Sequence, residues 1–284
     1  MQLSIKFPDM PSVPTEATLF ATPPPAWQPR AIADLARRSR IEGEIVDRGP
    51  WLVVEDGRAA LEIYQASDSL RYGRLNPDGE LQDPGSEPPD QDAARTIADA
   101  WVREFAPRGS RFDPHSITEA ELLVSRGEDA EPERYVTALH VDYRFTLGDL
   151  ALLGPGAKMQ VAIDRTGEVT DAYRFWREPH AIGTERVITP EEAFDRFARG
   201  PMFTDLSDDT ARAEVTDARL GYLALPPTEP QSVLMPSYEL RGVLATELHP
   251  RYEFIAHVPA AEIEGVALKR AARPGPSPGA AVPG

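Results

Sequence analysis

The chain lacks cysteine altogether. This absence excludes disulfide bonds, cysteine-ligated zinc, iron–sulfur clusters and thiol nucleophiles. Long apolar runs are missing as well: no stretch approaches the roughly 18 residues of a membrane-spanning helix, and residues 1–8 lack the apolar core, about 7–15 residues long, of a secretory signal. The sequence as written therefore predicts a cytoplasmic protein with no membrane span. A location in the cell envelope is the alternative if a leader or an anchor has been removed.

Basic residues are scarce relative to acidic ones. The chain has 30 Lys and Arg against 46 Asp and Glu, which gives a formal net charge of −16. Proteins bind nucleic acids largely by displacing condensed counterions with Lys and Arg, so this balance argues against DNA or RNA as a partner. What the chain does have is 41% hydrophobic residues, enough for a packed core, and 29 prolines, which indicate many connections between short elements.

Composition divides the chain into segments. Seven prolines between residues 8 and 30 repeatedly fix φ, so this stretch is expected to hold little regular structure. Residues 76–89 are rich in turn formers and charges, and the residues beyond 269 are poor in large apolar side chains. We therefore predict a Pro-rich lead-in at 1–27, an N-terminal α+β unit at 28–75, a linker at 76–89, two further units at 90–180 and 187–262, and a disordered tail at 270–284.

Two helix starts are clear in the sequence. Asp90 is suited to be an N-cap, and apolar residues follow it at helical spacing over residues 94–105. Thr189-Pro190-Glu191-Glu192 combines a Thr N-cap, a proline at the first helical position and a glutamate three residues after the cap, which predicts a capping box. A shorter amphipathic helix is expected at residues 31–36.

Strand signals alternate with these helices. Residues 135–145 place apolar side chains at odd positions and His140, Asp142 and Arg144 at even positions, the period-2 pattern of a half-buried strand. Asp56-Gly57 predicts a hairpin turn, because both residue types tolerate positive φ. Since one helix followed by mainly antiparallel strands recurs along the chain, we predict an α+β fold of repeated helix-plus-antiparallel-sheet units.

Parts of the second and third units resemble known modules. PepSY-type modules are resembled by the run Gly154-Pro155-Gly156-Ala157-Lys158-Met159-Gln160-Val161-Ala162-Ile163-Asp164-Arg165-Thr166-Gly167-Glu168-Val169, which closes with Phe175-Trp176-Arg177. Ile188-Thr189-Pro190-Glu191-Glu192-Ala193-Phe194, with Leu220-Gly221-Tyr222 and Leu234-Met235-Pro236-Ser237-Tyr238-Glu239, is similar to regulators of the YycH/YycI type. The resemblance covers about residues 90–260 and marks the second unit as PepSY-like and the third as YycI-like. It implies non-enzymatic modules that inhibit or regulate partner proteins, usually outside the cytoplasmic membrane.

Residue types that carry catalysis or hold metals lack the spacing for either role. The five histidines show no spacing that places two imidazoles on one metal ion. Ser237 lies outside any Gly-x-Ser-x-Gly elbow, and the capping box accounts for Glu191 and Glu192. The acidic cluster at 205–209 lacks the pattern of a calcium-binding loop. We therefore predict no catalytic residue, no metal site and no cofactor.

The candidate binding residues lie on two predicted strands, at 135–145 and 169–177. The first strand offers a polar face, and the second an aromatic and cationic stretch that could clamp an anionic ligand or a partner peptide, because guanidinium groups stack on rings and pair with carboxylates. The alternative is structural: a solvated sheet face and a strand core edged by arginines. The predicted binding residues are His140, Asp142, Arg144, Tyr173, Arg174, Trp176 and Arg177.

Three functions are open on these observations. The first is a non-catalytic binding or regulatory protein that presents antiparallel sheet surfaces to a protein partner, since an exposed strand edge captures a partner strand without catalytic residues. The second is an enzyme or small-ligand-binding protein with a pocket between the repeated units. The third is an acidic, chaperone-like partner of a basic protein, whose binding weakens as salt rises. The oligomeric state is left open.

Overall fold

The computed structural model describes residues 4–8, 12–74, 88–107, 110–125, 131–200, 212–245 and 251–261. The described helices are α1 (Pro29–Arg38), α2 (Gln91–Phe105) and α3 (Pro190–Ala198). The described strands are β1 (Ser4–Lys6), β2 (Glu16–Ala21), β3 (Ile45–Asp47), β4 (Trp51–Glu55), β5 (Ala59–Tyr64), β6 (Leu70–Arg74), β7 (Arg111–Val124), β8 (Glu133–Leu147), β9 (Leu150–Leu153), β10 (Lys158–Asp164), β11 (Val169–Phe175), β12 (His180–Arg186), β13 (Arg212–Leu223), β14 (Val233–Leu234), β15 (Pro236–Ala245) and β16 (Tyr252–Pro259). The protein is therefore mainly β, with helices packed on sheets.

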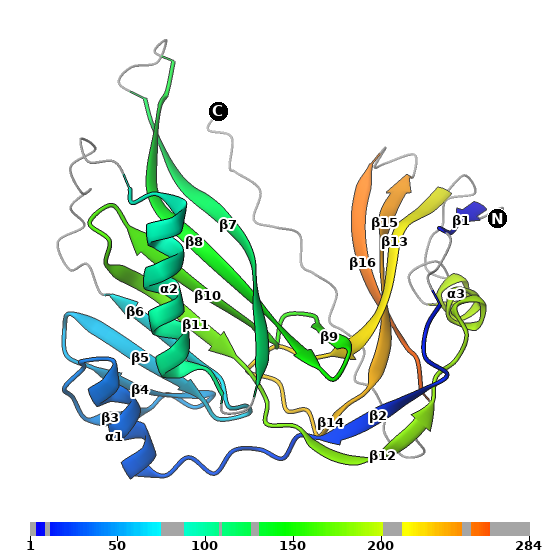
Figure 1. The fold of residues 1–284 in the computed structure, drawn as a ribbon, viewed down its shortest axis with the longest axis horizontal. Helices are drawn as coiled ribbons and strands as arrows, with labels where there is room; N and C mark the ends of the chain where they lie inside the picture. The colour runs from blue at the N-terminus through cyan, green and yellow to red at the C-terminus, as the bar shows by residue number, and fades with distance from the viewer. Residues whose placement is uncertain are drawn as a thin grey trace.

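One large mixed sheet of 13 strands, mostly antiparallel, forms the body of the molecule (Figure 1). Its order is β16-β15-β13-β9-β8-β10-β11-β6-β5-β4-β3, with β1 beside β13 and β7 beside β8. Among the described strands, the pairs β1–β13 and β9–β13 are parallel. A small sheet has the order β12-β2-β14. A single continuous sheet thus passes through all three units that the sequence predicts.

The N-terminal segment holds more regular structure than the sequence predicts. β2 pairs with β12 and β14, and β1 pairs with β13. β2 occupies the proline-free run between Pro14 and Pro23, where alternating side chains bury Ala17 and Leu19. Proline removes a backbone donor only at its own position, so the intervals between prolines are free to form strands.

The predicted helix starts and hairpin turn are confirmed. The Asp90 side chain accepts a hydrogen bond from the Ala93 backbone N–H at 2.8 Å and caps α2. At α3, the Glu192 N–H donates to Thr189 Oγ1 at 3.2 Å, and the Glu192 carboxylate accepts from the Thr189 N–H at 2.8 Å, which completes the capping box. The turn between β4 and β5 places Gly57 at a φ of 79°.

Each helix covers one face of a stretch of sheet. α2 packs on β8, β10 and β11, and the odd residues of β8 from Leu139 to Phe145 are buried there, as the alternation predicts. α3 covers β13, β15 and β16 around Tyr238 and Leu240, and α1 packs over β4, β5 and β6. The opposite face of the sheet is polar, and none of the described helices lies on it (Figure 1).

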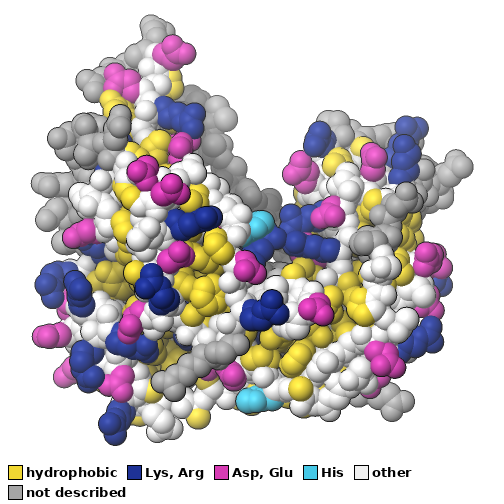
Figure 2. Space-filling view, in the orientation of Figure 1, with side chains coloured by type: hydrophobic (Ala, Val, Ile, Leu, Met, Phe, Trp, Pro, Cys, Tyr) yellow, Lys and Arg dark blue, Asp and Glu magenta, His cyan; other side chains and the backbone are white. Residues whose placement is uncertain are grey.

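Figure 2 shows a hollow between two lobes of the molecule, open at the top of the view. We use "the hollow" for the space between the uncovered face of β8, β10 and β11 and that of β13, β15 and β16, its two walls. β9 joins the walls: it pairs antiparallel with β8 and parallel with β13 over residues 221–223. The strands approach so closely that a Cβ at Gly221 would lie 2.4 Å from the Ala151 carbonyl oxygen. The joint therefore requires glycine at this position.

Some predicted features lie outside the described residues. The predicted linker at 76–89 is outside them apart from residues 88 and 89, and the acidic cluster at 205–209 and the predicted tail at 270–284 are wholly outside them. In the part of the chain that the structure describes, no helix has the length and apolar character needed to cross a membrane.

Candidate functional site

Four of the seven predicted binding residues share one uncovered face of the sheet. His140, Asp142 and Arg144 alternate along β8 and point away from α2, and Tyr173 lies two strands away on β11, on the same face. The Asp142 carboxylate accepts a hydrogen bond from the Gln160 side chain of β10 at 2.8 Å. These residues form the first wall of the hollow, so the structure brings this part of the predicted set together.

The other three predicted residues lie in the protein interior. Arg174 and Trp176 alternate with Tyr173 and therefore point to the face that α2 covers, where 9% and 3% of their surfaces are exposed. Arg177 is 4% exposed and donates to three backbone carbonyl oxygens between residues 225 and 229, at 2.6 to 2.8 Å. The seven residues thus do not form one lining. Arg174 and Arg177 bind backbone carbonyl oxygens of distant segments, and the Trp176 ring packs in the core beside Phe145.

A cavity of about 660 Å³ lies between α1 and the end of α2, and Arg37, Arg38 and Arg174 line it. Arg38 donates to the Glu104 carbonyl oxygen at 2.8 Å, and Arg174 donates to the Phe105 carbonyl oxygen at 2.7 Å. Both side chains therefore satisfy the last carbonyls of α2, which have no partner within the helix. Burial lowers the pKa of Arg174 to about 10, so it stays charged at neutral pH. Binding to the end of α2 therefore explains the position of Arg38 and Arg174, without a ligand in the cavity.

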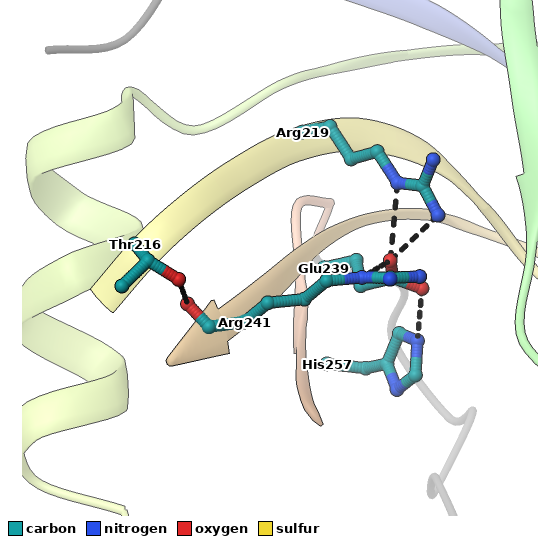
Figure 3. Close-up of polar contacts among 5 residues, drawn as sticks. All are labelled: Thr216, Arg219, Glu239, Arg241 and His257. Carbon is teal, nitrogen blue, oxygen red and sulfur yellow. Dashed lines mark hydrogen bonds and ion pairs between the residues drawn. The ribbon is translucent and has the colours of Figure 1, made fainter. Parts of the chain in front are cut away.

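The second wall of the hollow carries a cluster that the sequence analysis did not predict (Figure 3). Glu239 on β15 lies in register with Arg219 on β13 and His257 on β16, and Arg241 follows two residues later on β15. Arg219 Nε and Nη2 donate to Glu239 Oε1 at 3.0 and 2.7 Å, and Arg241 Nε donates to the same oxygen at 2.8 Å. His257 Nε2 lies 3.3 Å from Glu239 Oε2. One carboxylate thus orients side chains from three strands.

Glu239 is ionised despite its burial. Its side chain is 3% exposed, and burial raises its pKa, but hydrogen bonds from His257 and Arg241 and the charge of Arg219 outweigh burial and lower the pKa to about 2. An ionised carboxylate only accepts hydrogen bonds, so His257 Nε2 carries the proton in this contact. A carboxylate of such low pKa is a poor proton acceptor at neutral pH. The geometry therefore suits positioning of the arginines better than acid–base catalysis.

Both arginines of the second wall keep unused hydrogen-bond donors. A guanidinium has five N–H donors in a planar fork, and Glu239 engages two nitrogens of Arg219 and one of Arg241. The two side chains are 32% and 41% exposed. Figure 2 shows Lys or Arg side chains beside a histidine in the hollow. The remaining N–H groups are therefore accessible to a ligand that enters the hollow.

Arg144 lies on the first wall, on the uncovered face of β8. Burial lowers its pKa, and the charges of Arg219 and Arg241 lower it further. Within the described residues, Arg144 makes no ion pair. We use "the arginine cluster" for the set formed by Arg144, Arg219, Arg241, Glu239 and His257.

The described residues offer little for metal binding or covalent chemistry. Within the described ranges, no three His, Asp or Glu side chains gather closely enough to hold a metal ion. Ser237 is 2% exposed, and its hydroxyl donates to the Met235 carbonyl oxygen at 3.4 Å. The arginine cluster presents guanidinium groups that Glu239 orients, and their free N–H donors are suited to hydrogen bonds with an anion.

The alternation of polar and apolar residues shows which side chains lie on the polar face of each strand of the second wall. It does not show that side chains from three strands contact one another. Glu239 and Arg241 alternate with buried Tyr238 and Leu240, so a strand with one polar face is readable in the sequence. Arg219 and His257, however, are 20 and 18 residues from Glu239 in the chain, and the register of three strands brings them together. Local patterns do not reveal which distant strands pair or in which register, so the sequence analysis missed the cluster.

Comparisons with known proteins assign no family. No protein-family model matches the chain, and no curated protein matches it. Among solved structures, the chain is similar to an uncharacterized protein from Eubacterium rectale, known from a crystal structure at 1.45 Å resolution. The two share 7% sequence identity, the likeness covers 90% of this chain and 87% of that chain, and the TM-score is 0.49. The resemblance to PepSY-type and YycH/YycI-type modules thus stays a prediction.

Proposed function

We propose that the protein is a non-catalytic binding protein that presents antiparallel sheet surfaces to a protein partner, and that the walls of the hollow are the binding surface. An α+β organisation with a PepSY-like unit at 90–180 and a YycI-like unit at 187–262 belongs to this proposal, as does a regulatory role. The observation that carries it is the arginine cluster, which gathers cations from both walls on faces that no described helix covers.

Apolar and aromatic side chains beside the charges support a protein as the partner. Ile255 on β16 is 56% exposed and is the register partner of Arg241, so it lies on the wall of the hollow. On the facing wall, Lys158 Nζ lies 5.3 Å from the ring centre of Tyr173. Aromatic and arginine side chains are enriched in protein–protein interfaces, which combine an apolar core with a polar rim.

The alternative, an enzyme or small-ligand-binding protein with a pocket between the units, has less support. Arg38 and Arg174 in the cavity between α1 and α2 are engaged by the end of a helix. The hollow is open in Figure 2, whereas a ligand pocket buries most of its ligand.

The proposal is tested by affinity capture of partners from the host, with cytosol and envelope fractions kept apart so that the compartment is read as well. Ile255→Ser and Tyr173→Ser each alter one wall of the hollow. Ile182→Ser on β12, in the small sheet, is a matched control, because Ile182 is 57% exposed and Ile255 is 56% exposed. We expect each wall variant to retain about fivefold less of a stoichiometric partner than the wild-type chain, the loss typical of an interface residue worth about 1 kcal/mol.

Two outcomes contradict the proposed function. One is equal retention of the partner by all three variants, and the other is a loss confined to Ile182→Ser. Melting temperatures of the variants, measured alongside, separate loss of the surface from loss of the fold.

A further inference from the structure

We infer that the arginine cluster binds the carboxylate groups of an acidic polypeptide segment that lies in the hollow. This inference rests on the proposed function and names the chemistry of the partner.

Glu239 orders two guanidinium groups without neutralising both. Arg219 and Arg241 share this one carboxylate through contacts of 2.7 to 3.0 Å, so the two positive charges and one negative charge leave one positive charge in excess. The free N–H groups of a guanidinium match a carboxylate in a bidentate fork. Because Glu239 already holds both side chains, a ligand carboxylate meets preorganised donors and less side-chain freedom is lost on binding.

Arg144 adds a cation that has no ion-pair partner among the described residues. It lies on the uncovered face of β8, where its register partner on β7 is Asp113, and two residues from Asp142, whose carboxylate is engaged by Gln160. Burial lowers its pKa, and the charges of Arg219 and Arg241 lower it as well. Like charges that face one another across a gap are stabilised when an anion enters it. A carboxylate between the walls would contact arginines on both sides.

The open shape of the hollow favours a polypeptide over a small anion. The Arg219 and Arg241 side chains are 32% and 41% exposed, and single exposed charge pairs contribute little to binding. An extended segment adds contacts along its length, with side chains on one face about 7 Å apart. Ile255 beside Arg241 offers an apolar contact between charged positions. A phosphate polymer is disfavoured by the net charge of −16.

The test uses the full chain and two fluorescently labelled eight-residue peptides, one of alternating Glu and Thr and one of alternating Gln and Thr. Fluorescence anisotropy measures both affinities in about 0.1 M salt, where surface charges are screened beyond about 10 Å. We expect the Glu peptide to bind at least about tenfold more tightly, because hydrogen bonds between charged groups are roughly twice as strong as neutral ones. Equal affinities overturn the inference.

Competition separates the possible anions. Unlabelled Glu peptide is expected to displace the labelled peptide at a lower concentration than citrate or a short polyphosphate. If citrate displaces it first, the site takes small carboxylates and a polypeptide ligand is wrong; if polyphosphate does so, a carboxylate ligand is wrong.

Single substitutions then locate the binding site. We expect Arg144→Gln to weaken binding of the Glu peptide about tenfold, the loss of one charge-assisted hydrogen bond, and Arg144→Lys to weaken it less. Arg37→Gln on α1, where the Arg37 side chain is 76% exposed, makes the same change in net charge outside the hollow and should leave the affinity unchanged. If Arg37→Gln weakens binding as much as Arg144→Gln, overall charge explains the effect and the inference is wrong.

The two proposals fail in different ways. If Ile255→Ser and Tyr173→Ser lose the captured partner while Glu and Gln peptides bind alike, the carboxylate chemistry is wrong and the proposed function stands. If the wall variants keep their partner, the proposed function is wrong, whatever the peptides do.

Discussion

Glu239 and Arg144 are both charged, but Glu239 is paired with residues of opposite charge, whereas Arg144 has no ion pair among the described residues. Glu239 is 3% exposed and accepts hydrogen bonds from two arginines. Arg144 lies on the uncovered face of β8 and has no ion pair within the described residues; burial and then the charges of Arg219 and Arg241 lower its pKa. The first residue therefore stabilises the fold, whereas the second contributes a charge that the fold does not need. Their substitutions are expected to differ accordingly.

We expect Glu239→Gln to lower the free energy of unfolding at pH 7 by about 2 kcal/mol, since charge-assisted hydrogen bonds are lost and the arginines keep their mutual repulsion. The pKa of about 2 in the folded chain lies below the ordinary value of 4.5, so ionised Glu239 stabilises the fold above about pH 4.5 and this contribution is lost as the pH falls toward 2. Urea unfolding over this pH range should show a steeper loss in the wild-type chain. Parallel pH curves for the two chains would contradict this role.

Arg144→Gln should leave the free energy of unfolding within about 0.5 kcal/mol of the wild-type value, because it removes a cation that lacks an ion-pair partner among the described residues. Urea unfolding at pH 7 measures the difference. A loss of 2 kcal/mol or more, as large as the loss we expect for Glu239→Gln, would mean that Arg144 is a structural residue.

At the scale of helices and strands, features that depend on neighbouring residues are predictable from the sequence. Features that depend on the pairing of distant strands are not. The starts of α2 and α3 are predictable because a cap and its partners lie within three residues of each other. The polar face of β8 follows from its alternation. β2 was missed because the density of prolines hid a proline-free run, and the cluster around Glu239 was missed because it depends on the pairing of distant strands.

The capping box of α3 gives a prediction at this scale. Thr189→Ala removes the side chain that accepts from the Glu192 N–H, and we expect it to lower the free energy of unfolding by about 1 kcal/mol. Thr184→Ala on the exposed strand β12 is the control and should change the free energy by less than about 0.5 kcal/mol. Chemical denaturation of both variants measures the two changes; equal effects would show that the cap contributes nothing.

At the scale of the whole molecule, the charge of the hollow opposes the charge of the chain. The chain carries a net charge of −16, whereas the arginine cluster sets three arginines against one buried glutamate. The distant field of the protein therefore repels an acidic ligand that the hollow attracts at short range. Screening removes the distant repulsion first, because the Debye length falls from about 30 Å at 0.01 M salt to about 10 Å at 0.1 M.

This opposition predicts an unusual salt dependence of the association rate. Between about 0.01 and 0.1 M salt, the rate of association of the Glu peptide should rise severalfold, while that of the Gln peptide should stay constant. Stopped-flow fluorescence measures both rates. An association rate of the Glu peptide that falls with salt would mean that a positive field steers it to the protein, contrary to the net charge.

The joint between the two walls fixes the distance between the cations that a ligand would contact. Arg144 stands on β8 and Arg219 on β13, and the four-residue strand β9 lies between them in the sheet. Because a Cβ at Gly221 would lie 2.4 Å from the Ala151 carbonyl oxygen, a larger residue there would push the strands apart. Such a change would alter the separation of the cations without changing their number. The hollow would then select ligands by a different spacing of their charges rather than by a different number of them.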